Sequence, residues 1–69
     1  MDKEILEIKL INIIGGYGIV KCKERYLDYY GKPFSRIRTW YDVCLEEGCG
    51  DIIESFKTLK EARKWAKEN

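Results

Sequence analysis

The chain contains no histidine, and only one proline and one methionine, among its 69 residues. Histidine is the commonest general base near neutral pH, so its absence argues against acid–base and nucleophilic catalysis. Net charge is nearly absent too, because 13 basic and 12 acidic side chains leave +1. Only the placement of the charges can therefore indicate a polyanionic partner. We expect a protein that is not an enzyme and that needs no cofactor.

Long apolar runs are also missing. The most apolar stretch, residues 5–14, contains Glu7, Lys9 and Asn12 and is too short to cross a bilayer. The first residues are not followed by the apolar segment of a signal peptide. We therefore expect a soluble, cytoplasmic protein without a membrane partner.

The cysteines are too few and too irregularly spaced to form a framework. Cys22, Cys44 and Cys49 make an odd set without the paired spacing of a zinc site. We expect no metal site and no disulfide, and Cys22 is most simply a small core residue.

The apolar pattern predicts an α+β fold: an antiparallel β-meander of three to four strands with one C-terminal α-helix packed on one face. Alternation and β-branched residues indicate strands, in one domain over residues 1–69. Thr58 and Glu61 have the spacing of a helix-start capping box. The expected strands cover about residues 4–14, 19–29, 34–45 and 52–56, and the expected helix about residues 58–67.

Turn residues separate these elements. Gly15, Gly16 and Gly18 suit a hairpin loop, and they lack the following helix that a phosphate-binding loop requires. In the second strand, Val20, Cys22 and Tyr26 are expected to face the core, with Glu24 as an exception to the pattern.

Cationic residues alternate along the second and third expected strands. If these strands form a tight hairpin around residues 30–31, the numbers of facing residues sum to about 61. Opposed cations destabilise a hairpin, so this arrangement favours an anionic partner such as nucleic acid. The alternative is an ordinary solvated sheet face whose cations discourage aggregation. The predicted nucleic-acid-binding residues are Lys21, Lys23, Arg25, Arg36, Arg38 and Trp40.

The segments FKTLKEARKW (residues 56–65) and DYYGK (residues 28–32) resemble parts of the arm-type DNA-binding domain of tyrosine recombinases and integrases. The resemblance extends over about residues 17–67. It implies a three-stranded sheet with a C-terminal helix, whose sheet enters the DNA major groove. The matching sheet positions here are Lys21, Lys23, Arg25, Arg36 and Arg38. The chain departs from the family in its near-neutral charge and its additional first strand.

A protein–protein interaction module is the alternative function. Tyrosine and tryptophan are favoured anchors at protein interfaces. Trp40, Tyr29 and Tyr30 would then contact the partner of a small inhibitor or adaptor, of the kind found in phages and mobile elements.

Overall fold

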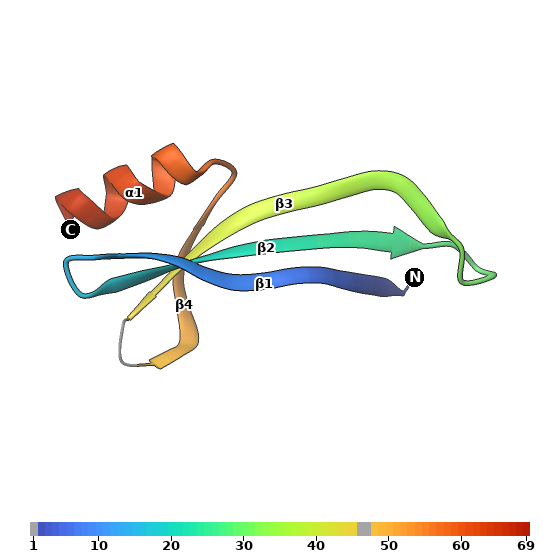
Figure 1. Cartoon of the computed structure of the whole chain (residues 1–69), viewed down its shortest axis with the longest axis horizontal. Coiled ribbons are helices and arrows are strands. Elements are labelled where there is room, and N and C mark those ends of the chain that lie inside the picture. Colours follow the sequence, from blue (N-terminus) through green and yellow to red (C-terminus); the bar gives the residue numbers. More distant parts are fainter. Residues whose placement is uncertain (1, 46–47) are drawn as a thin grey trace.

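The computed structural model describes residues 2–45 and 48–69. It contains a four-stranded antiparallel sheet with the strand order β1-β2-β3-β4, followed by one helix (Figure 1). The predicted fold class, an antiparallel meander with a C-terminal helix, is therefore confirmed. The elements are β1 (Lys3–Ile14), β2 (Tyr17–Leu27), β3 (Pro33–Leu45), β4 (Gly48–Phe56) and α1 (Leu59–Glu68).

The β1–β2 hairpin is closed by a two-residue glycine turn. Ile14 pairs with Tyr17, and the intervening Gly15 and Gly16 have φ values of 56° and 87°. Positive φ at both central positions is the geometry of the type I′ turn, which matches the twist of the flanking strands. The predicted hairpin is thus confirmed.

The helix begins as the sequence predicts. The Thr58 hydroxyl oxygen accepts a hydrogen bond from the Glu61 backbone N–H at 3.2 Å, which satisfies one of the free donors of the first turn. The Thr58 hydroxyl in turn donates to the Glu61 carboxylate at 2.9 Å. Ala62 and Ala66 form the buried stripe of α1.

The core lies between α1 and one end of the sheet. Ile19 of β2, Val43 of β3 and Ala62 of α1 are completely buried together. Trp65 lies over this cluster, with its ring 5.1 Å from that of Tyr17 and 6.4 Å from that of Phe56, measured between centroids. We call this side of the sheet the helix face.

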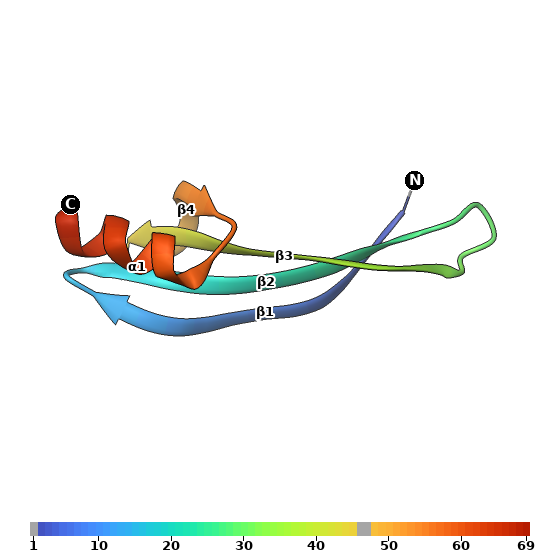
Figure 2. The ribbon, with the colours of Figure 1, turned by 90° about the horizontal axis from the view of Figure 1, so that it is seen from above.

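The molecule is elongated, because α1 covers only the end of the sheet near the glycine turn. The other end of β2 and β3 extends away from the helix as a long twisted ribbon (Figure 2). The extents are 44 × 22 × 16 Å and the radius of gyration is 13.7 Å. A compact chain of this length has a radius of gyration of about 11 Å.

Several strand boundaries and one cysteine differ from the predictions, and β2 ends at Leu27 rather than at residue 29. β2 begins at Tyr17 rather than at residue 19, and β4 begins at Gly48 although a turn was expected over residues 46–51. Glu46 and Glu47 of that expected turn, and the Cys49 side chain, lie outside the described residues. Cys22 is a free, buried thiol, whereas Cys44 is disulfide-bonded, which the odd cysteine count did not predict. In the described part of the chain, no helix is long and apolar enough to cross a membrane.

Candidate functional site

The β2–β3 register divides the predicted cationic stripe between two faces of the sheet. Directly opposed residues share a face, and the numbers of the opposed residues sum to 62 rather than 61 along most of this pair. The predicted pairing is therefore wrong by one residue, which inverts one strand relative to the other. Arg25 faces Ile37, Lys23 faces Thr39, Lys21 faces Tyr41, Glu24 faces Arg38 and Cys22 faces Trp40.

An irregular turn causes this shift. The Asp28 carboxylate accepts hydrogen bonds from the backbone N–H groups of Tyr30 and Lys32, at 2.9 and 2.8 Å. Gly31 adopts a φ of 80° within the same turn. Beyond it, the pairing jumps from Leu27–Pro33 to Arg25–Ile37, so β3 contributes extra residues in a bulge. A tight two-residue turn, on which the predicted register depended, is absent here.

Lys21, Lys23 and Arg25 lie on the helix face beyond the end of α1, beside acidic residues of β1. The Lys21 ammonium is 3.8 Å from the Glu7 carboxylate, and Arg25 Nε donates to the Glu4 carboxylate at 2.9 Å. Two of these three cations are therefore paired within the chain, which reduces their attraction for an outside anion.

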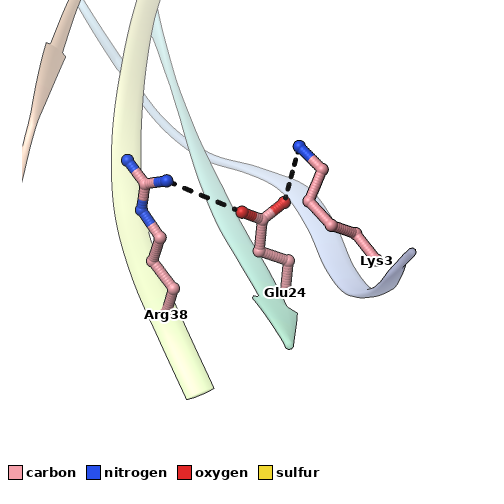
Figure 3. A network of polar contacts seen from close by, with 3 residues as sticks. All are labelled: Lys3, Glu24 and Arg38. Atoms are coloured by element: carbon pink, nitrogen blue, oxygen red, sulfur yellow. Dashed lines mark ion pairs between the residues drawn. The ribbon is translucent and has the colours of Figure 1, made fainter. Parts of the chain in front are cut away.

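Arg38 belongs to a polar network on the opposite face (Figure 3). Glu24 projects from β2 between Lys3 of β1 and Arg38 of β3, with N–O distances of 3.8 and 3.7 Å. Glu24 is 5% exposed, and the two ion pairs offset the cost of burying its carboxylate. The Arg38 guanidinium also lies 5.2 Å from the centre of the Trp40 ring, within the range of a cation–π contact.

A second buried acid on the same face, Asp42, is held by two side-chain hydrogen bonds. The Asp42 carboxylate accepts hydrogen bonds from the Ser55 hydroxyl at 2.6 Å and from the Cys22 thiol at 3.5 Å. Burial, the negative charge of Asp42, this hydrogen bond and the charge of Glu24 raise the pKa of the Cys22 thiol from 9.0 to about 11. Cys22 is thus a protonated donor and a poor nucleophile at neutral pH.

The face that α1 leaves uncovered is mainly apolar. We call it the open face. It carries four exposed aliphatic side chains from β1, the most exposed being Ile8 at 66%. A cavity of about 260 Å³ lies on this face, and residues of both edge strands line it: Ile5 and Ile8 of β1 and Ile52 of β4, with Trp40 between them. The open face is therefore concave. Its exposed aliphatic residues are Ile5, Ile8, Leu10, Ile13 and Ile52.

The outer edge of β3 forms a second candidate surface. β4 pairs with β3 only from Tyr41 to Leu45. The segment Pro33–Trp40, which we call the open edge, therefore has no pairing with β4 among the described residues, and its Pro33 and residues 37–40 pair with β2. A groove of about 750 Å³ runs along it, lined by aromatic, aliphatic and cationic side chains. These are Tyr26, Phe34, Arg36, Ile37, Arg38, Thr39, Trp40 and Lys57.

Two further surface features are an exposed tyrosine pair at the β2–β3 turn and a cationic strip on α1. Tyr29 and Tyr30, the predicted interface anchors, are exposed at the turn. Their rings contact each other edge to face, with 5.5 Å between the ring centroids. A cationic strip on α1, whose residues have helical spacing in the sequence, was not among the predicted sites. That strip comprises Lys60, Arg63, Lys64 and Lys67.

Neither a metal-binding cluster among the described residues nor any relative assigns a site. The described residues contain no group of three or more acidic or cysteine side chains that could hold a metal ion. No protein-family model matches the chain, and no curated protein and no solved structure matches it significantly. The candidate sites are therefore the open face and the open edge, as their geometry defines them.

Proposed function

We propose that the protein is a non-enzymatic protein-interaction module that works as a pair of chains joined through their open faces. The observation that carries this proposal is the exposure of Ile5, Ile8, Leu10, Ile13 and Ile52 on a face that the chain's only described helix leaves uncovered. Contiguous apolar surface of this kind marks interaction sites in soluble proteins.

The accessible surface area of the chain is large enough to include one protein interface of ordinary size. The chain has 5312 Å² of accessible surface, which is about 800 Å² more than expected for a folded monomer of 8.2 kDa. A standard protein interface buries about 800 Å² on each partner. The excess surface of this elongated chain thus matches what one interface would remove from water.

The open face of one chain can also pack against the open face of a second copy. Leu10 and Ile13 are exposed on it but do not line the cavity. In a two-fold arrangement, each copy can insert these side chains toward the cavity of the other, because such an interface repeats every contact. The two buried acids on this face, Glu24 and Asp42, already have partners within the chain, so pairing need not neutralise them.

Size-exclusion chromatography with light scattering, over micromolar to submillimolar concentrations, tests the proposal. We expect the wild-type protein to approach twice the 8.2 kDa mass of one chain. Ile8→Lys should weaken pairing by about 30-fold or more, because each of two isoleucines contributes about 1–2 kcal/mol when buried.

Ile37→Lys is the matched control, since Ile37 is 51% exposed but lies on the helix face. It should leave pairing within about threefold of wild type. A wild-type protein that remains monomeric at every concentration would overturn the proposal, as would equal effects of the two substitutions.

A further inference from the structure

The open edge of β3 offers unpaired backbone groups along eight residues, Pro33–Trp40. In a strand that is paired on one side, alternate residues direct their N–H and C=O groups outward. Figure 1 shows no other element beyond β3 over this segment, which bows away from α1 and β4. Such an edge can accept an extended peptide as an additional strand.

The side chains beside this edge define the chemistry of a peptide that fits. The groove contains the cations Arg36, Arg38 and Lys57, and no acidic residue is among the described residues that line it. Neither Arg36 nor Lys57 forms an ion pair within the described chain. Their charges are therefore available to carboxylates of a partner.

Apolar groups alternate with these cations. Phe34 and Ile37 are about half exposed in the same groove, with Trp40 at its inner end. Successive side chains of a strand point to opposite faces, so a partner strand would present one row to each side of the edge. A segment in which acidic and aliphatic residues alternate can place carboxylates near Arg36 and Arg38 and aliphatic groups near Ile37.

The same cations act against pairing between two open edges. Antiparallel association of two copies along this edge would bring their arginines close together, and like charges directly opposite destabilise a sheet. Cations on edge strands commonly prevent such self-association. The edge thus discriminates between its own copy and an acidic strand.

We propose that the open edge of β3 is a docking site for an extended acidic segment of another protein, which joins the sheet beside Pro33–Trp40 as a fifth strand. Trp40 borders both this groove and the cavity of the open face. Strand addition uses the backbone of the open edge, however, so this inference does not depend on the pairing of open faces.

Titration with a synthetic peptide, monitored by fluorescence anisotropy, tests the proposal. The probe is an amidated peptide of alternating glutamate and valine that carries a fluorescent dye at its N-terminus and is matched in length to the open edge. We expect saturable binding that weakens as salt is raised, and at least tenfold weaker binding by Arg36→Glu. Arg63→Glu, which makes the same charge change on the exposed side of α1, is the control and should change binding by less than about twofold.

Amide hydrogen exchange distinguishes strand addition from simple charge attraction. Saturating peptide should slow exchange at alternate residues of 34–40 by tenfold or more, without comparable change in β1. The Ile8→Lys variant should bind the peptide as tightly as the wild-type protein, so failure of open-face pairing and failure of this proposal are separable.

Three results would overturn the inference. The first is equal binding of a peptide in which lysine replaces glutamate. The second is binding without protection of the open edge. The third is tighter binding of a single-stranded oligonucleotide of similar length, which would assign Arg36, Arg38 and Trp40 to nucleic acid instead.

Discussion

The burial of Ile19 gives the strictest test of the register. Ile19 is completely buried beneath α1, whereas its neighbour Val20 points to the open face. Ile19→Ala removes three carbon atoms, which corresponds to about 2.4 kcal/mol of transfer free energy. The cavity left behind adds up to about 2 kcal/mol, so a loss of about 3–4 kcal/mol in the free energy of unfolding is expected.

This loss is large for so small a chain. A domain of this length has about 3–10 kcal/mol of total stability. Ile19→Ala should therefore shift the urea midpoint strongly, or leave part of the protein unfolded in buffer. Urea titrations followed by circular dichroism measure the change directly.

Ile37→Ala is the matched control, because it makes the same substitution at a half-exposed position beyond α1. It should cost about 1 kcal/mol or less. The reasoning is refuted if Ile37→Ala and Ile19→Ala are equally destabilising. It is refuted as well if Val20→Ala costs more than Ile19→Ala, since that result would place the other face of β2 in the core.

Two further predictions concern the buried thiol and the helix start. Because the pKa of the Cys22 thiol is about 11 in the folded protein and 9.0 without its surroundings, the folded chain keeps this proton between those pH values while the unfolded chain loses it. The stability from this group is complete below pH 9 and declines as the pH rises through 11. Between pH 8 and pH 10.5, urea titrations should show that the free energy of unfolding falls by about 2 kcal/mol more in wild type than in Cys22→Ser. Equal falls in the two proteins would contradict the assignment. Thr58→Ala removes the helix cap and should lower the free energy of unfolding by about 1 kcal/mol, measured by thermal melting, whereas Thr58→Asn should restore most of it. Unchanged melting of Thr58→Ala would show that this cap does not stabilise α1.

Local signals in the sequence predicted the elements of this fold. The glycine pair at residues 15–16 and the Thr58 cap act within a few residues, and both form as expected. Alternation of apolar residues likewise identified the strands. These features depend on backbone preferences that neighbouring residues determine.

The face on which each side chain lies was harder to predict, because the register between strands depends on bulges. The extra residues of β3 between Pro33 and Ile37 change the register, and Lys21, Lys23 and Arg25 therefore lie on the face opposite Arg38 and Trp40. Glu24 was the one signal in the sequence. A charged residue among Val20, Cys22 and Tyr26 is unusual for a core face, and these residues lie on the face that α1 does not cover. The ion pair of Glu24 with Lys3, at the start of the neighbouring strand β1, was not visible in any local pattern.

Nucleic-acid binding stays a prediction after this rearrangement. The six residues no longer form one stripe, and Lys21 and Arg25 have acidic partners in β1. Arg36 of the open edge and Lys57 beside it form no ion pair within the described chain, which is why an oligonucleotide belongs in the test of that edge.

Pairing through the open face is the central claim, and intermolecular methyl NOEs measure it most directly. A sample that mixes labelled and unlabelled chains reports only contacts between copies. The account predicts such contacts from the methyl groups of Ile8, Leu10 and Ile13, and none from Ile37. Contacts that arise from Ile37 and not from the open face, or the absence of any intermolecular contact at submillimolar concentration, would contradict it.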